Sequence, residues 1–419
     1  MLRTRHERLG LLILLALTGF PRLAVAGTTV VAGNCMNNFP HFPTIQAAVN
    51  AVPALGTVLV CPGNYPEQVV IAQPLNLNGV ASGGANDAVI TSPPGGVAQT
   101  FGPYSPQLLV TNATAVNITN IAVDGANNGI SACATLFVGI LYSNSSGTIN
   151  KVAARNQNLP GLPICGSGWG IRVIASVPQS STVTVENSSV RAWQFEGIRG
   201  RGDGVTMTIK NNYVSGFIPN HQPANAIDLN AGATGSITGN SIADAIWADN
   251  VFPDFGDATW GILLECVQGV IVSGNTIANT QGGIVLDNFF CSSFPNAPNT
   301  DSNVVSSNKI FNTQLYDAVY VCGNNNTVKG NTIQGAGESG IKLDNSCDAG
   351  PSGSNNTITS NTINESCAGI LINPATFGNS VSGNASTNVG STTLAGTLCG
   401  PLFGDPPGLP TGLIKPLDN

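Results

Sequence analysis

The sequence predicts a parallel β-helix, an all-β solenoid in which short strands of successive coils stack on one another. Two repeated patterns and their spacing predict it. The first is Gly or Ala followed by apolar, any and apolar residues, beginning at Gly139, Gly170, Gly197, Ala226, Gly261, Gly283, Ala318, Gly340 and Gly369. The second is Asn-x-apolar, at Asn240, Asn275, Asn308, Asn331 and Asn361. Steps of 22 to 35 residues are typical of solenoids. Short alternating strands with no helical stripe between them exclude helical repeats.

The first 26 residues form a segment of a different kind. Arginines at Arg3, Arg5 and Arg8 precede the apolar run LGLLILLAL, and the segment ends in AVA before Gly27. A charged start, a short apolar stretch and an Ala-x-Ala ending are typical of a cleavable signal peptide. The run is too short to span a bilayer, and no later stretch is long and apolar enough to do so. We therefore expect a signal peptide over 1–26 and a secreted, periplasmic or cell-surface protein.

The charge of the mature chain argues against nucleic acid as a partner. The sequence has 15 Lys and Arg against 22 Asp and Glu, and residues 1–26 hold four of the basic residues and one acidic residue. The mature chain therefore has 11 basic and 21 acidic residues, a net charge of −10 that repels a polyanion. An anionic polysaccharide would need a local basic patch or a bridging cation.

Residues 44–52, TIQAAVNAV, are predicted to form a short amphipathic helix. Thr44 is suited to cap its N-terminus. Four apolar residues share one face of this helix: Ile45, Ala48, Val49 and Val52. Because a solenoid needs its open end covered, we expect the helix to cap a single β-helix domain over 27–399. The Pro-rich residues 400–419 are expected to form an extended tail.

The segment TIQAAVNAVPALGTVLVCPGNYPEQVVI (44–71) resembles the start of the pectin lyase-like superfamily. Pectinesterases in particular have a similar helix followed by a V-x-V-x-P-G-x-Y-x-E strand and turn. The later coils are similar to the right-handed β-helix repeats of that superfamily, so the resemblance covers roughly 43–390. It implies a right-handed β-helix. It does not imply one chemistry, because the superfamily includes lyases, hydrolases, esterases, epimerases and non-enzymatic surface proteins.

The active-site motifs of several members are missing. The sequence lacks the esterase pattern GxVDFIFG, the paired aspartates and GHG of polygalacturonase-like hydrolases, and the DPHD-type motif of alginate epimerases. The tripeptide NTD at 299–301 lies in a Pro- and Asn-rich loop, and we interpret it as a coincidence.

Ten cysteines in an exported chain predict disulfides. Cys266 and Cys291 are 25 residues apart, as are Cys322 and Cys347, and the pairs hold matching positions relative to their strands. Cys133 and Cys165 both lie just ahead of a repeated strand. Elimination leaves Cys35–Cys61 and Cys367–Cys399, whose pairing the sequence does not establish. Metal ligation is the less favoured reading, since no CxxC or nearby histidine accompanies the cysteines.

In each repeated strand the two variable positions point away from the core, so stacked coils form two outward columns. The first column contains Arg172, Arg199, Asp228, Leu263, Val285, Tyr320, Lys342 and Leu371. The second contains Ile174, Arg201, Asn230, Glu265, Asp287, Cys322, Asp344 and Asn373. In lyases that the sequence resembles, an equivalent face forms the sugar groove.

This face is the predicted site. A lyase that acts on uronates needs a base for the proton beside the carboxylate and positive charge, often Ca²⁺, for the enolate-like intermediate. The catalytic candidates are Arg199, Arg201, Asp228 and His221. The candidates for substrate binding are Arg172, Lys342, Trp169 and Trp260, the two tryptophans as sugar-stacking faces. Glu265 and Asp287 are the candidate ligands of a Ca²⁺ ion.

Each of these residues also has a plain structural interpretation. Outward strand positions carry charges in any soluble solenoid, and neighbouring opposite charges stabilise by pairing. The sequence therefore leaves three functions open: a lyase or epimerase on an acidic polysaccharide, a non-catalytic glycan-binding or adhesive protein, and a structural solenoid. We expect a monomer. Arg199→Ala is expected to abolish ligand binding or turnover. It is expected to leave thermal stability nearly unchanged, because an exposed ion pair contributes at most about 1 kcal/mol.

Overall fold

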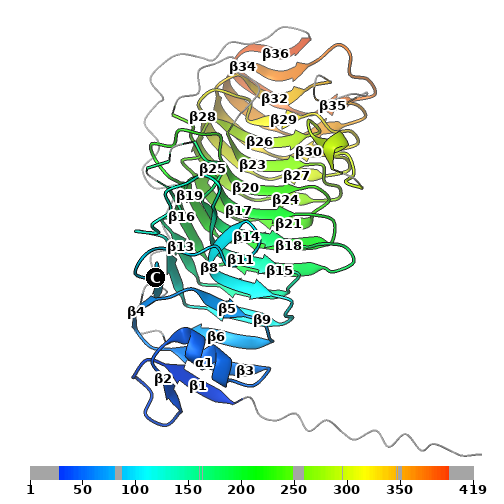
Figure 1. Cartoon of the computed structure of the whole chain (residues 1–419). Helices are drawn as coiled ribbons and strands as arrows, with labels where there is room; N and C mark the ends of the chain where they lie inside the picture. The colour runs from blue at the N-terminus through cyan, green and yellow to red at the C-terminus, as the bar shows by residue number, and fades with distance from the viewer. Residues whose placement is uncertain are drawn as a thin grey trace, which may run out of the picture.

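The computed structural model describes residues 28–395, apart from 81–86, 160, 163, 249–258, 295, 346 and 348–351, with side chains described as far as 390. Within these residues the coils stack along one axis, from the N-terminal coils in blue to β36 in red (Figure 1). The expected signal peptide over 1–26 and tail over 400–419 lie outside the described residues.

One sheet runs the length of the solenoid and contributes one strand to each coil. Its strands pair in parallel, and in sheet order they are β2 (His41–Phe42), β1 (Thr29–Ala32), β3 (Gly56–Val60), β6 (Leu75–Gly79), β9 (Val116–Thr119), β12 (Gly147–Asn150), β15 (Ser181–Glu186), β18 (Val205–Lys210), β21 (Thr234–Thr238), β24 (Ile271–Ser273), β27 (Val304–Ser306), β30 (Thr327–Lys329), β33 (Thr357–Thr359) and β35 (Ser380–Ser382).

A second sheet of 22 strands contains two columns. The first column is β4 (Gly63–Pro66), β7 (Ala88–Thr91), β10 (Ala122–Asp124), β13 (Ala153–Arg155), β16 (Ser189–Trp193), β19 (Tyr213–Gly216), β22 (Ser241–Ala243), β25 (Thr276–Thr280), β28 (Lys309–Thr313) and β31 (Thr332–Ala336). The second is β5 (Val69–Ile71), β8 (Tyr104–Thr111), β11 (Leu136–Ser143), β14 (Trp169–Ile174), β17 (Glu196–Arg201), β20 (Asn225–Asn230), β23 (Trp260–Glu265), β26 (Gly282–Asp287), β29 (Val319–Val321) and β32 (Ser339–Leu343). The long strands β34 (Thr362–Ile372) and β36 (Ala385–Ala395) continue both columns.

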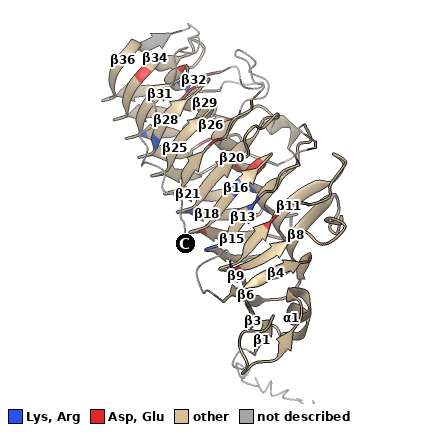
Figure 2. Ribbon diagram, turned by 90° about the vertical axis from the view of Figure 1, so that its left-hand side faces the viewer, with Lys and Arg blue, Asp and Glu red and all other residues tan. Residues whose placement is uncertain are grey.

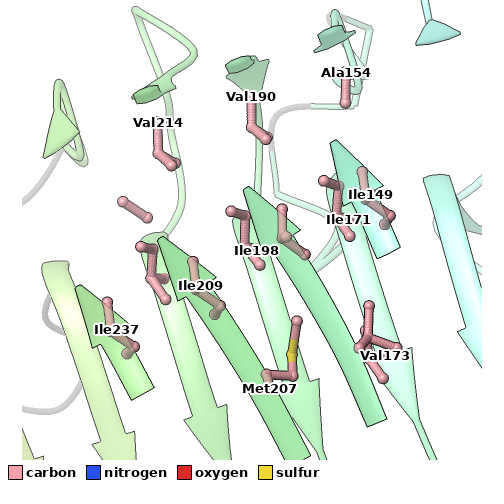
Figure 3. Close-up of a cluster of buried hydrophobic side chains, with 14 of the residues drawn as sticks. Ile149, Ala154, Ile171, Val173, Val190, Ile198, Met207, Ile209, Val214 and Ile237 are labelled. Atoms are coloured by element: carbon pink, nitrogen blue, oxygen red, sulfur yellow. The ribbon is translucent and has the colours of Figure 1, made fainter. Parts of the chain in front are cut away.

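The apolar positions of the repeat stack inside the coil as aliphatic ladders. Ile171 lies opposite Ile198 on the next strand, and Ile198 lies opposite Ile227. All three are fully buried. Figure 3 shows these inward side chains meeting those of the facing sheet, such as Met207 and Ile209. The predicted fold class, a parallel β-helix, is confirmed.

The predicted cap is also present. Helix α1 (Ile45–Ala51) has Thr44 as its N-cap, whose Oγ1 accepts a hydrogen bond from the Ala47 amide at 3.1 Å. The carboxylate of Glu67 accepts bonds from the amides of Ile45 and Gln46 at 2.7 and 2.9 Å. The glutamate of the pectinesterase-like turn therefore fastens the helix to the first coils, in agreement with its favourable interaction with a helix N-terminus.

The asparagines stack as a ladder beside the core. Amide Nδ2 groups donate to the Oδ1 of the next coil at 2.9 to 3.0 Å, along Asn240, Asn275, Asn308, Asn331 and Asn361. These bonds join each coil to the next, so the asparagines have a structural role. Positive φ falls on the residue before each asparagine, such as Gly239 (φ 64°) or Gly274 (φ 66°), and not on the asparagine itself.

Four disulfides lie within the described residues: Cys35–Cys61, Cys133–Cys165, Cys266–Cys291 and Cys322–Cys347. The three pairs predicted from position are confirmed, and so is the Cys35–Cys61 pair that elimination left. Cys367 is also disulfide-bonded, and Cys399, the partner that elimination assigns to it, lies outside the described residues. In the described part of the chain, no helix is long and apolar enough to cross a membrane.

Candidate functional site

The outward columns have the predicted register. Arg172 lies opposite Arg199, and Arg199 lies opposite Asp228, on the adjacent strands β14, β17 and β20. In the second column Glu265 of β23 lies opposite Asp287 of β26. The stacking order that the sequence predicted is confirmed.

The exposure that we expected for these columns is wrong. Arg199 is only 7% exposed, Asp228 1% and Lys342 7%. Aromatic side chains from the segment after β26 lie over part of this face: the ring of Phe294 lies 4.9 Å from the Arg201 guanidinium carbon, and Phe289 lines the same pocket. Alternation along a strand gives the direction of a side chain but not what other segments place over it.

These columns form the floor of a pocket of about 590 Å³. It extends from Arg199 on β17 to Lys342 on β32, which are five strand pairings apart. Adjacent strands are about 4.8 Å apart, so this span is about 24 Å. That length suits an extended chain of several rings better than a single small molecule.

Charge is concentrated in this pocket. Figure 2 shows how sparsely acidic and basic residues are distributed over the ribbon. Ten of the 37 Asp, Glu, Lys and Arg residues of the chain line the pocket. The seven acids are Glu196, Asp228, Glu265, Asp287, Asp317, Glu338 and Asp344, and the three bases are Arg199, Arg201 and Lys342. This acidic excess favours ligands that carry no negative charge.

One end of the pocket holds an arginine cluster of Arg199, Glu196 and Asp228. Arg199 Nη1 donates to Glu196 Oε1 at 2.5 Å, and its Nε lies 3.3 Å from Asp228 Oδ2. Burial, only partly offset by Arg199, raises the pKa of Asp228 well above its ordinary value. Asn230 donates to Asp228 at 3.0 Å. Both partners of the arginine are buried, so the cluster is a compact and nearly dry ion network.

The other end holds a lysine cluster of Asp317, Glu338, Lys342 and Asp344. Lys342 Nζ lies 3.9 Å from Glu338 Oε1 and 3.4 Å from Asp344 Oδ2. Asp344 also accepts hydrogen bonds from the Tyr320 hydroxyl at 3.1 Å and from Asn373 at 2.8 Å. The lysine lies over the Tyr320 ring, 4.9 Å from its centre.

Glu338 differs from the other acids of this cluster. It is fully buried, and neither of its carboxyl oxygens has a hydrogen-bond partner. Burial and the nearby Asp317 raise its pKa to about 8, against the opposing effect of Lys342. A carboxyl group in this setting keeps its proton at neutral pH and is able to donate it.

Glu265 lies midway along the pocket. Burial and the neighbouring Asp287 raise its pKa to about 7. The assignment of Glu265 and Asp287 to a Ca²⁺ ion stays a prediction.

An aromatic wall lies between the two charged ends. The Trp260 ring stacks on Tyr316 with ring centres 5.6 Å apart and on Tyr320 with centres 5.9 Å apart. Trp260 is therefore placed in the pocket wall, where the sequence predicted a sugar-stacking face. Flat aromatic surfaces beside polar groups are suited to the apolar face of a sugar ring.

Three candidate residues lie outside the pocket. The Arg172 guanidinium is 4.4 Å from the Trp169 ring centre and 5.0 Å from that of Tyr104, and neither Arg172 nor Trp169 lines the pocket. Trp169 is connected to the arginine cluster, since its Nε1 donates to Glu196 at 2.5 Å. His221, between β19 and β20, is not a pocket residue either. Its catalytic role stays a prediction without support from this geometry.

Glu196, Asp317 and Glu338 are pocket residues that were not predicted from the sequence. Each comes one or two residues before the Gly or Ala that opens a repeated strand. The two predicted columns contain only positions after that residue. In a chain with 9% charged residues, acids at this recurring position were a usable signal.

A disulfide forms part of the pocket wall. Cys347 lines the pocket and its Sγ lies 3.1 Å from the Tyr320 hydroxyl. Its partner Cys322 follows Val321, so in the second column it stands between Asp287 and Asp344. A carboxylate oxygen of Asp287 and the two sulfur atoms lie within 4.8 Å of one another.

Comparison with solved structures shows the same architecture in a tailspike protein and in a lacto-N-biosidase. The chain is 16% identical to the Dettilon tailspike protein, with a TM-score of 0.55 over 81% of this chain and 62% of that one. It is 11% identical to the GH136 lacto-N-biosidase of Eubacterium ramulus, with a TM-score of 0.55 over 88% and 68%. Identities this low show the fold alone, and the chain spans less than two thirds of the tailspike.

At the level of sequence, no curated protein matches the chain. The family described as periplasmic copper-binding protein (NosD) matches residues 176–397. That range contains every residue of the pocket. The periplasmic description of this family agrees with the export that the first 26 residues predict. The match covers more than half of the 419 residues, and so the chain belongs to the NosD family, with the right-handed β-helix that its resemblance to the pectin lyase-like superfamily predicted.

Proposed function

We propose that this protein is an exported enzyme that binds a neutral glycan along the pocket and hydrolyses a glycosidic bond. The observation that carries the proposal is Glu338, a fully buried carboxyl with a pKa of about 8 and no hydrogen-bond partner, facing an aromatic-lined pocket. Such a group is suited to protonate the oxygen of a leaving sugar.

Asp344 is the second carboxyl that the reaction needs. Lys342 Nζ lies 3.9 Å from Glu338 and 3.4 Å from Asp344, so the two carboxyl groups are at most about 7 Å apart, an upper limit that is compatible with the separation in retaining glycosidases. Hydrogen bonds from Tyr320 and Asn373 stabilise a carboxylate at Asp344. Glu338 would give its proton to the glycosidic oxygen, and Asp344 would activate water or attack the anomeric carbon.

The charge balance favours this reaction over chemistry on an acidic polysaccharide. Seven acids against three bases line the pocket, and Arg199 and Lys342 are already paired with carboxylates. The acidic side chains would repel the carboxylate of a uronate, and neither Arg199 nor Lys342 would be available to pair with it. A neutral sugar would pack against the aromatic residues that line the pocket and bond to the surrounding carboxylates without that cost.

The test is incubation of the purified protein with neutral and uronate-containing glycans. We expect new reducing ends from a neutral glycan, and we expect Glu338→Gln to lower turnover by at least about 100-fold. Glu365→Gln, a matched change outside the pocket, should leave turnover unchanged. Unsaturated products from a uronate polymer would instead favour the lyase, and binding without turnover would favour a glycan-binding protein. Both outcomes contradict hydrolysis.

The name of the NosD family raises copper as a second candidate ligand, and the described residues do not fit it as they stand. Copper favours imidazole and sulfur donors. In the described part of the chain, the only group of three or more His, Cys, Asp or Glu ligands close enough to share an ion is Asp287, Cys322 and Cys347. Both sulfur atoms are held in a disulfide, which offers no thiolate. We derive no catalytic step through copper.

A further inference from the structure

The two ends of the pocket differ in the sign of their charge. Five of the seven acids lie from β23 onward, where Lys342 is the only base among the described pocket residues. On β14, β17 and β20, by contrast, three bases accompany two acids: Arg172, Arg199 and Arg201 against Glu196 and Asp228. These three strands therefore have a net positive charge, even with both acids ionised.

Arg201 is the base of the pocket that lacks an ion pair. Within the described residues no carboxylate is paired with it, whereas Arg199 and Lys342 each have two such partners. In the second column Arg201 stands between Ile174 and Asn230, which are both uncharged. Its side chain is only half-buried and lines the pocket, so a ligand there can reach it.

The surroundings of Arg201 are suited to a carboxylate. The Phe294 ring lies 4.9 Å from its guanidinium carbon and occupies one face of the planar group. The N–H groups lie in the plane of the guanidinium, where they match the two oxygens of a carboxylate. Glu265 interacts with Arg201 from β23, but burial and Asp287 raise the pKa of Glu265 to about 7. At neutral pH Glu265 is therefore only partly ionised and competes only in part with a bound anion.

Arg172, on the strand next to Arg201, also has an uncompensated positive charge. It is 5% exposed, and its Nε and Nη1 are buried without a hydrogen-bond partner. Glu196 acts on it electrostatically but uses its two oxygens for Arg199 and Trp169. Burial and the adjacent Arg199 lower the pKa of Arg172 to about 10. A buried charge without a counter-ion is costly, and an anion bound beside Arg201 would offset part of that cost.

We propose that Arg201 binds the carboxylate of an acidic sugar at this end of the glycan. The inference rests on the proposed function and narrows its substrate class: the glycan is neutral over the acidic part of the pocket and has one acidic unit at β17. Glu338 comes just before β32, five strand pairings from β17, so the cleaved bond would lie about 24 Å from the acidic unit. Arg201 would then determine the direction in which the glycan binds.

The test is an NMR titration of the purified protein with D-glucuronate and D-glucose, which differ only in a carboxylate against a hydroxymethyl group at C6. Acetate supplies a carboxylate without a sugar. We expect glucuronate to bind at least about tenfold more tightly than glucose or acetate. The measurement involves no turnover, so its failure is separable from failure of glycan hydrolysis.

Two variants locate the carboxylate. Arg201→Gln should remove the preference, so that glucuronate binds no more tightly than glucose. Lys210→Gln is the matched control, because it removes a positive charge outside the pocket, from a partly exposed pair with Glu186, and it should keep the preference. Equal affinity of the wild type for glucuronate and glucose, which requires no variant to fold, would overturn the proposal. Acetate binding as tightly as glucuronate, or a preference that persists in Arg201→Gln, would overturn it as well.

Discussion

Among the residues of this protein, those with buried charged side chains are expected to have the largest effect on stability when they are replaced. Arg199 is the clearest case, because the network around it is nearly closed to water. Its partners Glu196 and Asp228 are 2% and 1% exposed. Removing one member of such a network leaves the other charges buried without compensation, which costs more than the pair contributes.

Arg199→Ala should therefore destabilise the protein by about 3 to 5 kcal/mol, and the small effect that the sequence analysis predicted is corrected accordingly. The measurement is the free energy of unfolding from denaturant titration. Arg155→Ala serves as the matched control, because Arg155 is partly exposed in its pair with Asp124 and should cost at most about 1 kcal/mol. Equal losses in the two variants would contradict the burial argument.

Glu338 should make stability depend on pH. Burial and Asp317 raise its pKa from 4.5 to about 8, while Lys342 opposes and Asp344 adds to the rise, so the folded state holds this proton more tightly than the unfolded state. Its stabilising contribution is complete below about pH 4.5 and is lost as the pH rises through about 8. In denaturant titrations from pH 4 to 9, the free energy of unfolding should decline less steeply with pH for Glu338→Gln than for the wild type. Parallel curves would show that Glu338 does not titrate as inferred.

At the scale of elements, the repeat predicts most of what the structure contains. Strand register, the aliphatic ladders and three disulfides follow from spacing, because each coil repeats the environment of the one before. Helix α1 follows from its N-cap and its apolar face. The covering of the columns does not follow from it. The segment containing Phe289 and Phe294 is not part of the repeat, so no periodic argument places it over Arg201. The position of Glu338 before a repeated Gly is readable in the sequence, whereas its full burial is visible only in the structure.

The asparagine ladder should contribute to stability cooperatively. The loss of stability on replacing one asparagine should depend on how deeply that asparagine is buried. Asn275 is fully buried and bonds to both neighbouring coils, whereas Asn384 ends the ladder and is half-buried. Asn275→Ala should lower the free energy of unfolding by about 1 to 3 kcal/mol, since it leaves buried partners unsatisfied. Asn384→Ala should cost clearly less. Thermal or denaturant unfolding of both variants provides the comparison.

At the scale of the whole molecule, the solenoid is closed at one end and less covered at the other. Helix α1 packs over the first coils (Figure 1), and its apolar face is buried. At the far end, β35 has no fully buried residue, whereas Ile358 of the preceding strand β33 is buried. Because each coil contacts mainly its neighbours, local opening within the described residues should cost least in the coil of β35, whose strand has no fully buried residue.

Hydrogen exchange should therefore follow the order of the coils. We expect amides of β20 and β23 to be the most protected and those of β35 and the start of β36 to exchange fastest. Peptide-resolved exchange measured by mass spectrometry gives the profile. Uniform protection from β17 to β36 would indicate a single cooperative unit instead.

The position of the pocket along the stacking axis has a consequence for how its size can change. The arginine and lysine clusters lie an integral number of coils apart, so their separation can vary only in steps of about 4.8 Å, the distance between adjacent strands. Gain or loss of one coil between the two clusters would lengthen or shorten the pocket by about 4.8 Å. The side chains of both clusters would be unchanged. Related chains with more or fewer coils between the two clusters would therefore fit longer or shorter ligands, while the charged residues at the two ends of the pocket stay the same.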